Sequence, residues 1–168
     1  MEILLSPEDI ALADAVAHKR QAAAEAKGRI SGNGGATRGS VALRNHIFGA
    51  RCELAGKKYL DPIKWNDFSE IVNNDLPDLG DFIDVKGITQ RHHRLVVQKK
   101  DRNDWAYLLV SSQHHPWYLG FGWLWGHEAK DERFWDDPVG GRAAFFVNTK
   151  LKPLRPPSEL LAIVRSKD

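Results

Sequence analysis

The sequence predicts a single α/β domain in which a central mixed sheet carries a long helix on one face. Two kinds of segment favour this class: helix-forming stretches in the first third of the chain, and stretches with an apolar/polar period of two, typical of strands, after it. The chain has 168 residues, of which 42% are hydrophobic and 27% are charged. That length and composition are sufficient to bury one globular core.

Two helices are expected before the strands. The first covers residues 6–27, with Ser6 as N-cap and Pro7 in the first turn, and a Gly-rich break at residues 32–35 follows it. The second begins at residue 39 or 40 and ends at Leu60, because the next residue precedes a proline and is biased away from helical geometry.

The second half of the chain is expected to form a meander and a final helix. The pattern predicts strands at residues 82–88, 94–99, 105–111, 117–125 and 143–147, a short helix at 128–135, and a helix from residue 158. The single domain is therefore divided into an N-terminal helix with its Gly-rich break (1–35), a core (36–112), and an aromatic, β-rich C-terminal extension with the last helix (113–168).

Composition excludes several classes of protein. The single cysteine, Cys52, excludes a disulfide framework within the chain and a zinc site built from thiolates. No apolar run reaches membrane-spanning length, and the acidic N-terminal segment lacks the apolar core of a signal peptide. We therefore expect a soluble cytoplasmic protein that binds no membrane.

The net charge of +2 conceals a sharp change of sign along the chain. Residues 61–85 contain seven acidic residues and one lysine, whereas residues 86–102 contain six basic residues and one aspartate. Such a change is typical of a metal site beside a phosphate-binding surface, although two solvated charge clusters give the same pattern.

The strand at residues 82–88 spans this change of sign. Alternate side chains of a strand share a face, so Asp84 and Lys86 lie on one face and the apolar Ile83 and Val85 on the other. A carboxylate suits a hard divalent cation. A neighbouring lysine can stabilise the charge of a phosphoryl transition state, or it can orient and help deprotonate the attacking water. A surface ion pair that contributes little is the alternative.

Further acidic residues are needed to fix a cation. Asp78 is preferred because Gly80 can turn the chain back toward Asp84, and Asp81 remains open as the alternative. Glu53 on the second helix is another candidate. It is flanked on its helix face by small residues, including Gly49 and Gly56, which would let that face approach the sheet closely. Glycine destabilises a helix, so two glycines beside one glutamate indicate a packing or functional role.

These residues, in this order, resemble the motif of the PD-(D/E)XK nuclease superfamily. The matching positions are Pro77-Asp78, then Asp84-Val85-Lys86, with Glu53 on the preceding helix where members often place an accessory metal ligand. The chain from Gly39 onward is also similar to a group of small phage-encoded proteins. The resemblance implies a restriction-endonuclease-like fold, with a mixed central sheet flanked by helices.

The resemblance also implies a function: an endo- or exodeoxyribonuclease that uses Mg²⁺ or Mn²⁺, acting in the cytoplasm of a bacterial or phage-infected cell. Metal ligands would come from Asp78, Asp81, Asp84 and Glu53, and Lys86 would assist attack by water. Gln98 on the next strand is expected to position water or backbone. Basic residues and two histidines of the following hairpin would contact DNA: Arg91, His92, His93, Arg94, Lys99 and Lys100.

A second hypothesis is a degenerate nuclease fold that binds nucleic acid or protein without catalysis. DNA is the expected partner in the first case, and a homodimer is left open in both. The two hypotheses differ in whether the acidic residues and Lys86 act on a metal and a phosphate.

Overall fold

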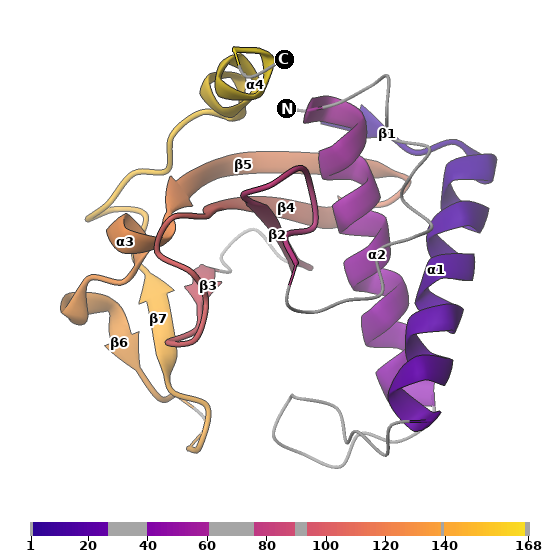
Figure 1. Cartoon of the computed structure of the whole chain (residues 1–168), viewed down its shortest axis with the longest axis horizontal. Coiled ribbons are helices and arrows are strands. Elements are labelled where there is room, and N and C mark those ends of the chain that lie inside the picture. The colour runs from indigo at the N-terminus through magenta and orange to yellow at the C-terminus, as the bar shows by residue number, and fades with distance from the viewer. Residues whose placement is uncertain (1, 27–39, 61–75, 90–93, 139, 167–168) are drawn as a thin grey trace.

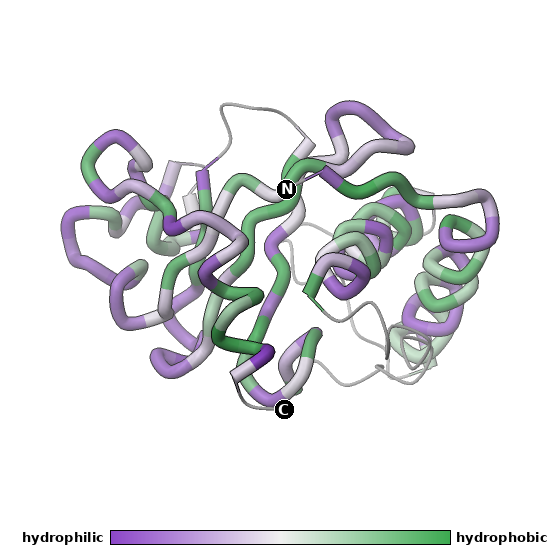
Figure 2. Tube along the Cα trace, turned by 90° about the horizontal axis from the view of Figure 1, so that it is seen from above, coloured by the Kyte–Doolittle hydropathy of each residue, from purple (hydrophilic) through white to green (hydrophobic). Residues whose placement is uncertain are grey.

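The computed structural model describes residues 2–26, 40–60, 76–89, 94–138 and 140–166, which form three layers (Figure 1). Helices cover one face of a four-stranded sheet, and a three-stranded sheet packs near its other face. Seen from above, the two long helices lie side by side at one end, while the loops at the other end are largely hydrophilic (Figure 2). The predicted α/β class is confirmed.

The main sheet is mixed, as expected. Its strand order is β1 (Glu2–Leu4), β5 (Trp117–Trp125), β4 (Ala106–His114) and β2 (Ile83–Ile88). Strands β2 and β4 are parallel, whereas β4–β5 and β1–β5 are antiparallel. This order leaves β2 at the outer edge of the sheet, where only one of its sides is paired with a strand.

The second sheet consists of three short strands: β3 (Leu95–Val97), β7 (Ala144–Val147) and β6 (Trp135–Asp136). Its apolar residues join Tyr107, Leu109 and Leu124 of the main sheet in a second core cluster. A short helix, α3 (Gly126–Ala129), and a 3₁₀ helix, η2 (Glu132–Phe134), contribute to the same cluster and stand where a single helix over 128–135 was expected. That expectation was wrong because the chain turns after Ala129 and again at Phe134.

The helical layer is built from α1 (Pro7–Ala26), α2 (Ser40–Leu60) and α4 (Pro157–Arg165). The predicted N-cap of α1 is confirmed: the Asp9 N–H donates to Ser6 Oγ at 3.2 Å, and the Ser6 N–H donates to Asp9 Oδ2 at 2.7 Å. Among the described helices, none combines the length and apolar character needed to cross a membrane.

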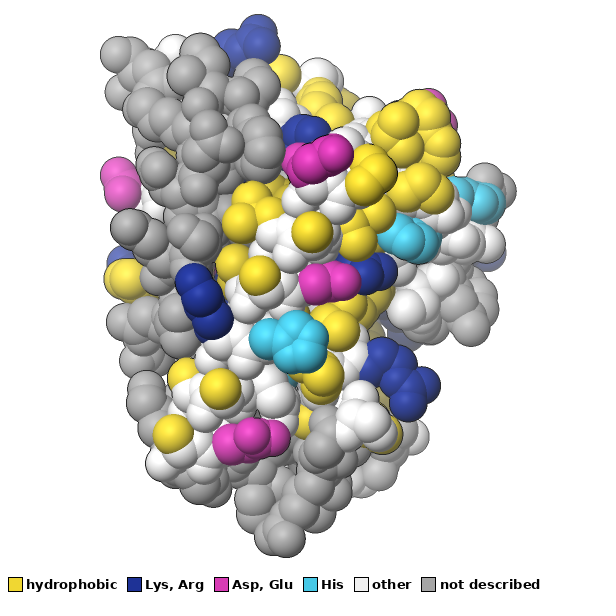
Figure 3. All heavy atoms as spheres, turned by 90° about the vertical axis from the view of Figure 1, so that its right-hand side faces the viewer, with side chains coloured by type: hydrophobic (Ala, Val, Ile, Leu, Met, Phe, Trp, Pro, Cys, Tyr) yellow, Lys and Arg dark blue, Asp and Glu magenta, His cyan; other side chains and the backbone are white. Residues whose placement is uncertain are grey.

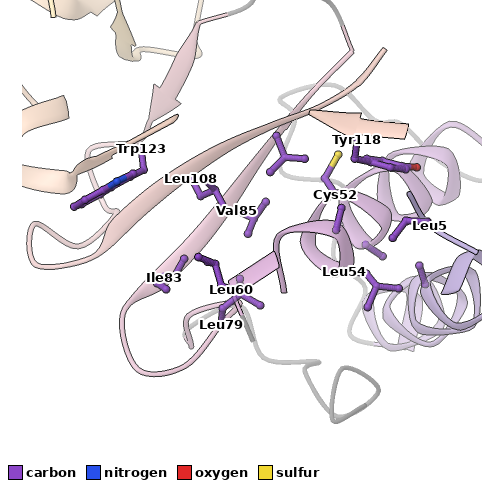
Figure 4. Packing of buried hydrophobic residues seen from close by; sticks show 14 of the residues in the cluster. Leu5, Cys52, Leu54, Leu60, Leu79, Ile83, Val85, Leu108, Tyr118 and Trp123 are labelled. Atoms are coloured by element: carbon purple, nitrogen blue, oxygen red, sulfur yellow. The ribbon is translucent and has the colours of Figure 1, made fainter. Parts of the chain in front are cut away.

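The main core lies between α2 and strands β2 and β4. Cys52, Leu54 and Leu60 of α2 join Val85 and Leu108 in one buried cluster (Figure 4). Gly56 permits the close approach: a Cβ at this position would lie 3.1 Å from Val85 Cγ2. At Gly49 a Cβ would meet only Glu53 Oε1, at 3.7 Å. The expected role of small residues therefore holds at Gly56 but not at Gly49.

The strands of residues 113–168, where a β-rich extension is expected, are shared between the two sheets. Strand β5 lies inside the main sheet, between β1 and β4, and its Trp123 is fully buried. Helix α4 packs on the same core through Leu160, while β6 and β7 belong to the second sheet. Residues from both ends of the chain, such as Leu5 and Leu160, thus contribute to the core beneath the sheet that carries β2.

The two glycines of α2 provide a test of this packing. G49A should raise the free energy of unfolding by up to about 1 kcal/mol, because alanine favours a helix and meets no close neighbour. G56A should lower it by about 1–3 kcal/mol, because the new methyl group overpacks the contact with Val85. Urea unfolding of both variants checks this, and equal effects in the two would contradict it.

Candidate active site at the edge of strand β2

A tight turn brings Asp78 to the outer edge of β2. Leu79 and Ile83 exchange two backbone hydrogen bonds, of 2.9 and 3.1 Å, and Gly80 between them has a φ of +53°, which suits glycine. The chain therefore folds back, and the Val85 N–H donates to Asp78 Oδ2 at 2.7 Å. The turn expected at Gly80 is confirmed, and it is this turn that places Asp78 beside β2.

Asp84 and Lys86 share one face of β2, as their spacing predicts. Lys86 Nζ donates to Asp84 Oδ2 at 2.9 Å and lies 3.1 Å from Asp101 Oδ2, in the turn between β3 and β4. The ammonium also lies 5.1 Å from the centre of the Tyr107 ring. Lys86 is thus held between two carboxylates over an aromatic ring, with its side chain 25% exposed.

Glu53 approaches the same edge from the helical layer. Arg20 of α1 reaches it with both terminal nitrogens: Nη1 donates to Oε1 at 2.9 Å, and Nη2 lies 2.7 Å from Oε2. The side chains are only 16% and 12% exposed, so the pair is largely shielded from water. Glu53 is therefore fixed by an arginine of another helix.

The carboxylates of Glu53, Asp78 and Asp84 are crowded enough to affect one another. Burial, the charges of Glu53 and Asp84, and a hydrogen bond with Asp84 raise the pKa of Asp78 well above its usual range, against the opposing hydrogen bond from Val85. A carboxyl group that resists ionisation beside two other carboxylates is a group that a nearby cation would stabilise in its charged form.

Lys86 carries a proton at neutral pH. Burial acts to lower the pKa of its ammonium, but Asp84 and Asp101 more than offset burial, and the pKa is raised. A lysine in this state donates hydrogen bonds and positive charge. A protonated lysine is unsuited to take a proton from water, so this state favours the role of stabilising charge at a phosphoryl group.

The donor chemistry of this edge fits a hard divalent cation. Three carboxylates supply oxygen atoms, and Glu53 Oε2 is buried without accepting a hydrogen bond from the described part of the chain, although Arg20 lies beside it. Among the described residues, however, no three acidic, histidine or cysteine side chains are arranged so that they could hold one metal ion. Cations of the protein itself, Arg20 and Lys86, already contact two of the three acidic residues.

The other predicted site residues lie farther from the cluster or outside the description. Asp81 is exposed in the turn, and the structure brings Asp78 rather than Asp81 to Val85. Gln98 follows β3, is exposed, and donates its backbone N–H to Asp101 Oδ2 at 3.0 Å, so it joins the site only through Asp101. Arg94, Lys99 and Lys100 are exposed. Arg91, His92 and His93 lie outside the described residues.

Three residues near the cluster were not foreseen. Arg20 and Asp101 contact Glu53 and Lys86, and His46 lies two turns before Glu53 on α2. Burial and the positive charge of Arg20 lower the pKa of His46, so its ring is neutral at pH 7. The spacing of His46, Gly49 and Glu53 on one helix was a signal available in the sequence. Arg20 had no such signal, and Asp101 stood out only as the one acidic residue of a basic run.

Comparison with known proteins yields no relative. No protein-family model matches the chain, and no curated protein and no solved structure matches it either. The functional interpretation therefore depends on the residues of this edge and their contacts.

The raised pKa of Asp78 predicts a gain in stability on neutralising it. Between the pKa of an unfolded aspartate and the higher folded value, the native state holds a proton that the unfolded state has lost, so the wild type loses stability as the pH rises through this window. D78N lacks this loss, and its amide oxygen can still accept from Val85.

D78N should therefore be more stable than the wild type at pH 7–8. The difference in stability should shrink at pH values below the ordinary pKa of an aspartate carboxyl group. Urea unfolding from pH 3 to 8 measures it. D81N is the matched control, because it removes an exposed carboxylate of the same turn, and its stability at pH 7–8 should stay close to that of the wild type. A D78N profile parallel to that of the wild type would contradict the crowding of these carboxylates.

Proposed function

We propose that this protein is a divalent-metal-dependent nuclease that hydrolyses phosphodiester bonds of DNA at the outer edge of β2. The observation that carries the proposal is that Asp78 is hydrogen-bonded to Asp84 and to the Val85 N–H and feels the charge of Glu53, while Lys86 contacts Asp84. Oxygen ligands beside a fixed positive charge suit hydrolysis of a phosphate ester. The motif resemblance supports the same reaction and the restriction-endonuclease-like fold.

Each residue has a role that follows from its contacts. Glu53, Asp78 and Asp84 supply the carboxylates for Mg²⁺ or Mn²⁺, which when bound provides a Lewis acid for the phosphoryl group and the attacking water. Asp78 is positioned for this by Val85, whose N–H fixes one of its oxygens. The ammonium of Lys86 stabilises the negative charge that builds on the phosphoryl oxygens. Asp84 and Asp101 keep Lys86 protonated for this role.

The turn between β3 and β4 is the proposed contact surface for the DNA backbone. Lys99 and Lys100 are exposed there, next to Asp101, which contacts Lys86. The side of the molecule formed by α1 and α2 is less suitable, because basic, acidic and histidine side chains of its described residues are scattered among apolar ones (Figure 3). Phosphate contacts would therefore reach Lys86 from the side of the turn.

Cleavage of plasmid, linear and single-stranded DNA with Mg²⁺ or Mn²⁺ tests the reaction. K86A and D84N should each lower the rate at least about 100-fold, the scale for removing one preorganised electrostatic group. K58A is the matched control. Lys58 also contacts an aspartate, Asp9 at 2.6 Å, and its side chain is 26% exposed, but it lies between α1 and α2. It should keep the wild-type rate.

The outcomes separate the two hypotheses. Metal-dependent cleavage that is lost in K86A and D84N, with folding intact, supports the nuclease. Wild-type protein that binds DNA without cutting any substrate, branched DNA and RNA included, would favour the degenerate, non-catalytic fold. Two observations on the described residues favour that fold: Glu53 and Asp84 already have cation partners, and no three candidate ligands converge on one metal position.

The role of the turn has its own test. The double variant K99A/K100A should weaken binding to duplex DNA and reduce the slope of log affinity against log salt by up to about 2, because up to two phosphate contacts are lost. Fluorescence anisotropy in EDTA over a range of NaCl concentrations measures this without cleavage. K19A, an exposed lysine of α1, should leave the slope unchanged. If K99A/K100A and K19A show the same slope of log affinity against log salt, the DNA does not bind at this turn.

A further inference from the structure

Among the described residues, α1 and α2 are joined by the ion pairs of Lys58, Arg51 and Arg20, and the pair of Arg20 differs from the other two in its partner. Lys58 contacts Asp9 at 2.6 Å, and Arg51 contacts Asp14 with two hydrogen bonds of 2.7 Å. These two fasten the helices together at residues that have no part in the proposed site. The third pair, Arg20 with Glu53, instead engages a member of the acidic cluster.

Arg20 stands where it neutralises more than one acidic group. Its guanidinium engages both oxygens of Glu53, within 2.9 and 2.7 Å. Burial acts to lower the pKa of Arg20, but the contacts with Glu53 and the nearby charge of Asp78 more than offset it. The side chain is 16% exposed, so its charge is weakly screened by water. Arg20 is thus a cation held within the acidic cluster.

A guanidinium and a divalent cation compete for the same carboxylate. Both require Glu53 in its charged form, and a metal ligand must direct an oxygen lone pair at the metal. Near Glu53 Oε2 the guanidinium occupies part of the space and supplies much of the compensating charge. A buried carboxylate without a compensating cation would be costly, and Arg20 supplies that cation to Glu53.

We propose that Arg20 is the internal counter-ion of the metal site: it neutralises Glu53 while no metal is bound and must release Glu53 when a divalent cation enters. The proposal rests on the proposed nuclease site. It assigns to Arg20 control over the metal concentration at which the site fills. Exchange of one cation for another also keeps the charge of the cluster compensated in both states.

Two effects follow for a variant that lacks this charge. Without metal, R20Q leaves Glu53 uncompensated and should be less stable than the wild type. With metal, R20Q no longer competes for Glu53 and should bind Mn²⁺ about tenfold more tightly, which corresponds to roughly 1.4 kcal/mol. Mn²⁺ should therefore stabilise R20Q more than it stabilises the wild type.

The experiment measures Mn²⁺ binding by calorimetry and by the shift of Tm, with no DNA present. R51Q is the matched control, because it removes an arginine pair across the same two helices but leaves the acidic cluster intact. It should lose stability while its Mn²⁺ affinity remains that of the wild type. R20K, which keeps a positive charge without the two-nitrogen contact, should lie between R20Q and the wild type and serves if R20Q folds poorly.

The possible results separate this inference from the proposed function. Tighter Mn²⁺ binding in R20Q alone supports the counter-ion role. If the wild type binds Mn²⁺ and R20Q binds it equally well or more weakly, the counter-ion role is overturned, while the nuclease site stands. Absence of Mn²⁺ binding in every variant overturns both the counter-ion role and the metal-dependent nuclease.

Discussion

Electrostatic crowding of Glu53, Asp78 and Asp84 is the constraint on which the arrangement around β2 depends. Each carboxylate has its own compensating partner: an arginine of α1 for Glu53, a backbone N–H of β2 for Asp78, and a lysine of β2 for Asp84. The cluster therefore links the helix pair, the turn at Gly80 and the edge of the sheet. Such a concentration of like charge costs stability, and proteins retain it at places where they bind or react.

Much of the fold could be predicted because its signals are local. The N-cap at Ser6 and the break before Pro62 locate the long helices, and period-two patterns locate β2, β4 and β5. The remainder depends on contacts between distant residues. Strand β1 has three residues, too few to show a period, and exists because it pairs with β5. Nor does any pattern within β5 indicate that it lies in the middle of the main sheet.

The candidate site shows the same division. Strand parity placed Asp84 and Lys86 together, and the turn chemistry of Gly80 favoured Asp78 over Asp81. These are short-range rules. Arg20 lies 33 positions before Glu53, and its contact is set by how α1 packs on α2. Asp101 stood in the sequence as the one acidic residue of a basic run, and only the fold of its turn brings it to Lys86.

Strand β1 also covers part of one edge of β5. It pairs with β5 from Glu2 to Leu4, and the Leu5 N–H donates to the Pro116 carbonyl at 3.1 Å. The covered strand carries the exposed aromatic residues Trp117 and Phe121. Without the first five residues, β5 would present unpaired backbone groups beside these rings, a template on which strands of other molecules can add. Strand β1 thus replaces part of the long edge of β5 with an edge of three residues, which is a shorter template for other strands.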